Sequence, residues 1–171
     1  MRTLGTWLAV IALTLAVGSS AAPAGAQASR ATLSAADSAF VSTILQEARG
    51  QIDFAQFAQQ RSANPSVREL AAQTSAAWSA LADQLMEIAP SDDPPGSALT
   101  AAQQRMLDEL GQSYPSDFDA AYLRVAETDD ARALQAFSDE AGTMNPDLRA
   151  TIDECGQFFA QLEQATGQQS G

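Results

Sequence analysis

The sequence predicts an all-α protein: a four-helix bundle built from two helical hairpins, with a short extra helix in the connection between them. Three observations support this fold class. Apolar residues recur at spacings of three and four in four long segments, which is the period of an amphipathic helix. No segment shows the alternation of apolar and polar residues that is typical of a strand. Two short motifs also occur twice, in the same order.

The repeated motifs define the two hairpins. The opening motif occurs at residues 37–41 (DSAFV) and again 82 positions later at 119–123 (DAAYL). The closing motif occurs at 64–68 (NPSVR) and again 81 positions later at 145–149 (NPDLR). Asn followed by Pro is a helix-start signal, with Asn as the N-cap and Pro at the first helical position. Each copy therefore predicts a long helix, a tight turn and a return helix, related by duplication or pseudo-symmetry.

The first 28 residues have the pattern of a secretory signal peptide. Arg2 supplies a positive charge, an apolar run extends from Trp7 to Val17, and two Ala-x-Ala cleavage sites follow at 24–26 and 26–28. The alternative is a membrane anchor, but this run is too short to span a bilayer comfortably. We therefore expect a signal peptide at 1–28 and one helical domain at 29–171, with its core at about 33–164. The protein is expected in the periplasm or outside the cell, without a transmembrane anchor after cleavage.

The first hairpin begins with Ser34 as N-cap and Asp37 as its capping-box partner. Gly50, inside the first helix, indicates either close approach of another helix or a kink. Pro90 ends the second helix. The apolar stripe of the first helix consists of Val41, Leu45, Ala48, Ile52 and Ala55, widened by Phe40, Ile44, Phe54 and Phe57. The stripe of the second consists of Val67, Leu70, Thr74, Trp78, Leu81, Leu85 and Ile88.

A loop at 91–98 leads to the short third helix, which begins with a Thr100–Gln103 capping box and ends at Gly111. The fourth helix is predicted to start at Pro115-Ser116 and the fifth at Asn145-Pro146. Residues 166–171 are predicted to form a frayed polar tail. The apolar side of the third helix consists of Met106, Leu107 and Leu110; that of the fourth, of Phe118, Tyr122, Val125 and Phe137; that of the fifth, of Leu148, Ile152, Cys155, Phe159 and Leu162.

Composition excludes several functions. The chain carries 21 acidic and 9 basic residues, every basic one an Arg, for a net charge of −12. Such a surface repels nucleic acid and anionic lipid, so neither is an expected partner. There is no His, which excludes imidazole as a catalytic base or metal ligand. Cys155 is the only cysteine, so its thiol is either buried or joins two chains; its place on the apolar stripe favours burial.

The middle of the fourth helix carries Glu127, Asp129 and Asp130, which could together form a carboxylate-only metal site. We favour the interpretation that they form a solvated helix face, because adjacent helical residues point in different directions. Burying unpaired carboxylates is also costly, so Asp129 and Asp130 are not both expected inside.

The motifs resemble the domain-of-unknown-function 4142 family, exported bacterial proteins assigned to the ferritin-like group. The residues that carry the resemblance are 33–41, 64–68, 118–123 and 147–149, and it covers about residues 33–164. The resemblance implies a ferritin-like four-helix bundle. It also implies Asp-His in the second and fourth long helices and another His near the end. This chain instead has Ala77-Trp78, Asp129-Asp130 and Leu162 at the matching positions.

We therefore expect a non-enzymatic exported bundle of the cell envelope, acting as a structural or binding module whose protein or small-molecule partner is left open. No catalytic residue, cofactor or resident metal is predicted. The alternative is a ferritin-like protein that binds a metal or small ligand between its helices through carboxylates, with Glu127, Asp129 and Asp130 as the candidates. Trp78, large and apolar, is expected to fill the space that such a site would occupy.

Overall fold

The computed structural model describes residues 33–90, 98–140 and 145–170. They form five α-helices and no strand, which confirms the predicted all-α class. The predicted signal peptide and residues 91–97 of the predicted loop lie outside this part of the chain. The helices are α1 (Ala35–Arg61), α2 (Pro65–Ile88), α3 (Ala101–Gln112), α4 (Phe118–Glu140) and α5 (Pro146–Ser170).

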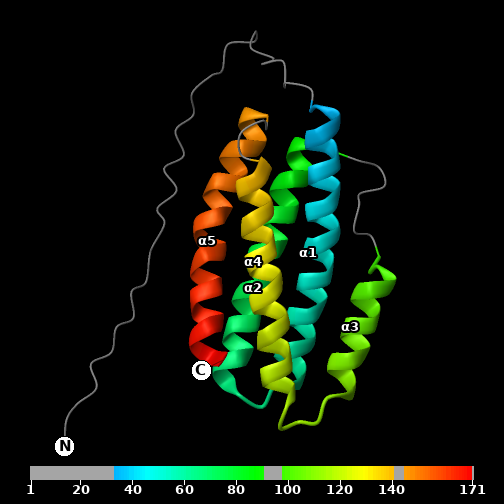
Figure 1. The fold of residues 1–171 in the computed structure, drawn as a ribbon, viewed down its shortest axis with the longest axis vertical. Coiled ribbons are helices and arrows are strands. Elements are labelled where there is room, and N and C mark those ends of the chain that lie inside the picture. Colours follow the sequence, from blue (N-terminus) through cyan, green and yellow to red (C-terminus); the bar gives the residue numbers. More distant parts are fainter. Residues whose placement is uncertain (1–32, 91–97, 141–144, 171) are drawn as a thin grey trace, which may run out of the picture. The chain divides into compact units, whose positions relative to one another are not determined.

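The four long helices form the predicted bundle of two hairpins. α1 packs along α2 and α4 packs along α5, while α2 against α5 and α1 against α4 join one hairpin to the other. Figure 1 shows these helices side by side, with the short α3 outside them in the connection between α2 and α4. Of the helices described, none is long and apolar enough to cross a membrane.

The helix-start signals of the sequence form the expected caps. The Ser34 hydroxyl accepts a hydrogen bond from the Asp37 backbone N–H at 3.0 Å, and the Asp37 carboxylate accepts one from the Ser34 backbone N–H at 3.0 Å. The side-chain oxygen of Asn64 accepts from the Ser66 N–H at 2.9 Å, and that of Asn145 from the Asp147 N–H at 2.9 Å. These bonds satisfy backbone donors that the first helical turn leaves unpaired.

Gly50 provides space for α3, which decides between the two interpretations of this glycine. A Cβ atom at Gly50 would collide with the side-chain amide of Gln103. That amide donates a hydrogen bond to the Gln46 backbone carbonyl at 2.9 Å, and Gln103 also forms the capping box of α3 with Thr100. Gly50 therefore lets the start of α3 approach α1.

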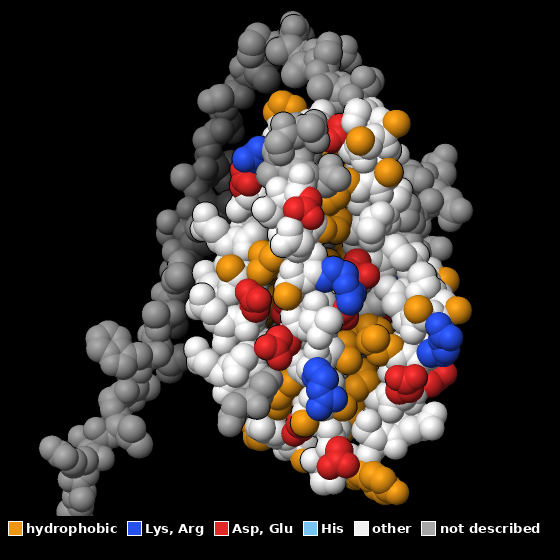
Figure 2. Space-filling view, in the orientation of Figure 1, with side chains coloured by type: hydrophobic (Ala, Val, Ile, Leu, Met, Phe, Trp, Pro, Cys, Tyr) orange, Lys and Arg blue, Asp and Glu red, His pale blue; other side chains and the backbone are white. Residues whose placement is uncertain are grey.

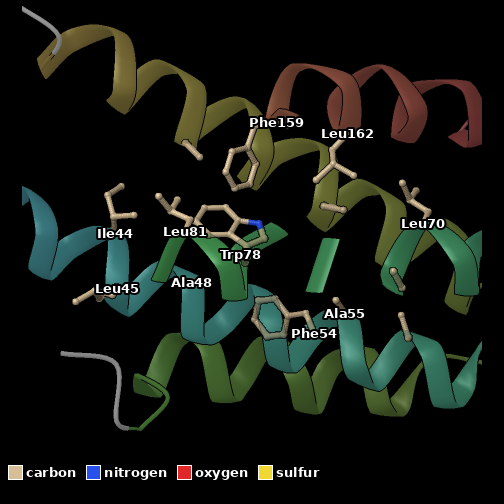
Figure 3. Packing of buried hydrophobic residues seen from close by; sticks show 14 of the residues in the cluster. Ile44, Leu45, Ala48, Phe54, Ala55, Leu70, Trp78, Leu81, Phe159 and Leu162 are labelled. Atoms are coloured by element: carbon tan, nitrogen blue, oxygen red, sulfur yellow. The ribbon is translucent and has the colours of Figure 1, made fainter. Parts of the chain in front are cut away.

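The predicted stripes form one apolar core, in which the largest fully buried side chains include Trp78, Tyr122, Phe54, Phe118 and Phe159. Figure 3 shows side chains from the two hairpins meeting between the helices. Every residue of the predicted stripes of α1 and α2 is buried except three that are half-buried: Ile52, Phe57 and Ile88.

Three boundary predictions were wrong. α4 begins at Phe118, because Pro115 lies in a turn that the Phe118 N–H closes onto the Tyr114 carbonyl at 3.0 Å. α3 continues one residue past Gly111, and Met106 on its predicted apolar side is exposed. α5 continues to Ser170 through the predicted polar tail. Thr166 is fully buried there, because it follows Leu162 by one helical turn on the core stripe.

Candidate functional site: a buried polar cluster in the bundle core

Three polar side chains in the middle of the bundle have atoms without a hydrogen-bond partner among the described residues. Trp78 comes from α2, and Tyr122 and Asp130 lie about two turns apart on α4. Their exposed fractions are 0%, 1% and 0%. Within the described part of the chain, no group bonds the Trp78 indole nitrogen, the Tyr122 hydroxyl or either Asp130 oxygen. Most buried polar groups in proteins are bonded, so this cluster requires an explanation.

Trp78 meets the cluster through its nitrogen and the apolar core through its rings. Its ring centroid lies 4.6 Å from that of Phe159, with the planes at 61°, and Phe159 meets Phe137 at 5.7 Å. Figure 3 shows the indole of Trp78 beside the ring of Phe159, between the helices. The side chain fills the centre at this level, as its size and stripe position predicted.

The surroundings of Asp130 favour its neutral form. Burial, followed by the negative charge of Asp129 and a smaller effect of Glu163, raises the pKa of its carboxyl group to about 7. The indole N–H of Trp78 lies near enough to lower this pKa in part, although its geometry is not that of a hydrogen bond. Burial also raises the pKa of Tyr122, with an opposing effect of the Thr74 hydroxyl and a reinforcing effect of Asp130. The carboxyl group thus carries a proton in acidic solution and loses it near neutrality.

Asp129 is buried where α4 contacts α1. Its carboxylate accepts hydrogen bonds from the Gln51 side-chain amide at 2.5 Å and from the Arg132 guanidinium at 2.7 Å. Arg132 also lies 3.6 Å from Glu47. Burial and the charge of Asp129 raise the pKa of Glu47, while Arg132 lowers it. Asp129 is therefore a paired buried charge, whereas Asp130 is an unpaired buried acid.

The model of the domain of unknown function DUF4142 matches residues 22–166 of this chain. The chain belongs to the DUF4142 family. Comparisons with curated proteins and with solved structures gave no match. In this DUF4142 chain, two of the positions where the resemblance implies imidazole hold Trp78 and Asp130. The fold brings these two side chains together across the core, close enough for the indole N–H to affect the carboxyl pKa.

The prediction that the α4 acids form a solvated face was wrong for two of the three residues. Asp129 and Asp130 are 4% and 0% exposed, although we expected at most one of them to lie inside. Hydrogen bonds from Gln51 and Arg132 offset the cost of burying the charge of Asp129. The raised pKa of Asp130 keeps its carboxyl group uncharged at low pH. Glu127 is exposed, as predicted. Because the three side chains point in three directions, they do not converge; no metal-binding group of acids or thiols occurs among the described residues.

The prediction that Cys155 is buried was also wrong, because its side chain is half-buried. Across from it α2 presents small side chains, Ala76 and Ala80, which leave a groove of about 360 Å³ between α2 and α5. The thiol lines this groove, and Phe158 is 41% exposed there. Burial and the charge of Glu154 raise the pKa of the thiol, which lowers its reactivity at neutral pH.

The sequence did not reveal that the Tyr122 hydroxyl would be buried in the core or that Gln51 would donate a hydrogen bond to Asp129. It also did not reveal that Trp78 and Asp130 would lie close together. One signal was present. Asp130 follows Tyr122 by eight residues and precedes Phe137 by seven, so it continues their helical stripe. Chemically the cluster can store a proton, donate hydrogen bonds from an indole and a phenol, and accept them at a carboxyl group.

Proposed function

We propose that this DUF4142 protein is an exported, non-enzymatic helical bundle that serves as a structural or binding module of the cell envelope. The observation that carries the proposal is the packing of Trp78. At a position where the resemblance implies an imidazole, this chain has an indole that is fully buried against Phe159. A centre filled in this way supports function through the surface of the bundle rather than through chemistry inside it.

Charge and composition support the same proposal. Without His, and with one half-buried cysteine whose thiol pKa is raised, the described residues offer no activated nucleophile paired with a base. The acidic surface suits a soluble protein. Figure 2 shows its Asp and Glu side chains scattered over one face rather than gathered into one patch.

Export predicts a processed N-terminus. Protein isolated from the envelope or medium of its native cell is expected to begin at Gln27 or Ser29, because cleavage follows the small-residue sites at 24–26 and 26–28. Intact-mass measurement of the purified protein distinguishes the two. Protein that keeps Met1 and stays embedded in the membrane would contradict the export part of the proposal.

The structural interpretation also predicts that the chain holds no resident transition metal. Elemental analysis of protein purified without chelators or a tag is expected to find iron, manganese and zinc well below one atom per chain. Trp78 is the only Trp outside the predicted signal peptide, so its fluorescence should be blue-shifted and unchanged by these metals. One metal per chain that is lost in Glu127→Gln or Asp130→Asn would instead establish the ferritin-like alternative.

A further inference from the structure

Two opposite faces of the bundle can be compared with each other. The long helices form a ring in the order α1, α2, α5, α4, because each packs along the next. The α1–α4 face and the α2–α5 face therefore lie on opposite sides, and each combines one helix from either hairpin. Both carry a hollow, of about 450 Å³ on the α1–α4 face and about 360 Å³ on the α2–α5 face.

The α1–α4 face is charged, and no aromatic ring protrudes beside its hollow. Arg132 of α4 lies 2.7 Å from Asp129 and 3.6 Å from Glu47 of α1. Asp139 lines the hollow, and the aromatic residue that lines it, Phe40, is buried. Ion pairs therefore join the two helices across this face, and the large apolar side chains at its hollow are already covered.

The α2–α5 face is uncharged over its middle. Residues 70–82 of α2 and 155–162 of α5 contain no charged side chain, and 70–82 is the longest uncharged stretch outside the predicted signal peptide. The charged residues that bound these two stretches are Glu69, Asp83, Glu154 and Glu163. Because the chain has a net charge of −12, two copies repel each other over most of their surface. They repel least where the uncharged face of one meets that of the other.

The same face carries an open groove and an exposed aromatic ring. Ala76 and Ala80 of α2 line the groove from one side, and Cys155 and Phe158 of α5 line it from the other. Both alanines are exposed and Phe158 is 41% exposed, so the groove and the ring are accessible. The Cys155 thiol donates to the Gln84 side-chain oxygen at 3.8 Å, so these parts of α2 and α5 lie at the same level along the bundle. The groove has room for a phenyl ring, since a cavity of about 150 Å³ holds benzene.

We propose that the α2–α5 face binds a second copy of this chain, in a two-fold dimer whose axis runs along the helices. Half a turn about such an axis sets α5 of each copy against α2 of the other and leaves every residue at its own level. Phe158 of each copy then enters the groove beside Ala76 and Ala80 of the other. A small apolar ligand would fill the groove but leave Phe158 exposed, whereas a second copy covers both. This inference rests on the binding half of the proposed function and gives that half a partner.

The size of the uncharged face predicts a weak dimer. Residues 70–82 extend about 20 Å along α2, and two helices side by side are about 20 Å wide. Two such faces bury on the order of 800 Å² in total, which lies at the low end of specific interfaces. The dimer is therefore expected to form and dissociate with protein concentration.

The test is sedimentation equilibrium of the full mature chain at protein concentrations from about 10 µM to about 1 mM, the range in which a weak dimer dissociates. We expect the average mass to rise from one chain to two and to stop there, because a two-fold contact closes on itself. Added salt should strengthen the association, since it screens the repulsion between acidic copies. A chain that stays monomeric over this range, a mass that passes two chains, or an association that weakens with salt would overturn the proposal.

Variants connect the association to this face. Ala80→Glu places a charge in the groove and is expected to weaken self-association at least tenfold. Phe158→Ala removes the ring and should weaken it to a similar extent. Ala39→Glu is the matched control, because it makes the same change at an exposed alanine in the hollow of the opposite face; it should leave self-association within twofold. Unchanged self-association in both Ala80→Glu and Phe158→Ala, at native helix content by circular dichroism, would refute this interface.

Cys155 reports on the same face, because it is the only cysteine and lines the groove. Its alkylation by N-ethylmaleimide should slow as the native chain is concentrated, whereas the rate in Ala80→Glu should not depend on concentration. A dimer with a constant alkylation rate would place the interface elsewhere and overturn the proposal. A monomeric chain in which toluene binds saturably and slows alkylation would assign the groove to a small apolar ligand and overturn it too. The export proposal is decided separately by localisation and the processed terminus.

Discussion

Phe159→Ala is expected to lower the free energy of unfolding by about 3–5 kcal/mol, the range found when a large buried aromatic side chain is truncated. Phe159 is 1% exposed and lies edge-on to both Trp78 and Phe137, at centroid distances of 4.6 and 5.7 Å. The change removes two aromatic contacts and leaves a cavity between the hairpins. Chemical denaturation monitored by far-UV circular dichroism gives the size of the loss.

The adjacent residue supplies a control for this measurement. Phe158 is 41% exposed at the rim of the α2–α5 groove, so Phe158→Ala should cost less than about 1 kcal/mol. Both changes delete the same atoms from the same helix, and both raise local helix propensity equally. Similar losses for the two variants would show that the assignment of the core face of α5 is wrong.

The main features of the fold could be predicted from the sequence because they depend on local chemistry. The Asn-Pro pairs at 64–65 and 145–146 determine where two helices begin, and the stripe around Trp78 determines which face is buried. Each of these signals is read within one or two helical turns. Together with the repeat they were sufficient to predict two hairpins and a short helix in the connection.

The errors occurred where one element depends on what another presents to it. The position of Cys155 on its helix was predicted correctly, but its exposure depends on the small side chains of α2 across the groove. The start of α4 depends on a turn around Pro115 that takes Ser116 away from the helix. Neither effect can be read from a single helical pattern.

The candidate site was predicted only in part, because a general rule about buried charge was applied without the partners that modify it. The cost of burial argued against placing both Asp129 and Asp130 inside. For Asp129 that cost is offset by hydrogen bonds from Gln51, which lies 78 positions away in the sequence, and from Arg132, one helical turn away. Asp130 avoids the cost of a buried charge in another way, because its raised pKa lets the carboxyl group stay protonated up to about neutral pH. Tyr122 was predicted to lie on the apolar side of the fourth helix, and no role was predicted for its hydroxyl group.

The second large effect is expected from the proton on Asp130. Its pKa is 3.8 in the absence of structure and is raised to about 7 in the folded protein, mainly by burial. Below pH 4 Asp130 is protonated in both the folded and the unfolded protein, and the folded protein has its full stability. Between about pH 4 and pH 7 the unfolded chain loses the proton first, so stability falls as the pH rises. Above pH 7 the loss is complete, and a shift of this size corresponds to about 4 kcal/mol.

Asp130→Asn should remove most of this dependence, because Asn keeps the shape of the side chain and stays neutral at every pH. We expect the variant to be roughly 2–4 kcal/mol more stable than the native chain at pH 8.5 and within about 1 kcal/mol of it at pH 5. Denaturant unfolding at both pH values gives the two differences. Asp129, Trp78 and Glu163 act on Asp130 and remain in both proteins, so the comparison isolates its own ionisation. Glu127→Gln, exposed on the same helix, should change stability by less than about 0.5 kcal/mol at either pH. If Asp130→Asn follows the native pH profile, the carboxyl group at the centre of the bundle is not the buried acid whose proton sets this dependence.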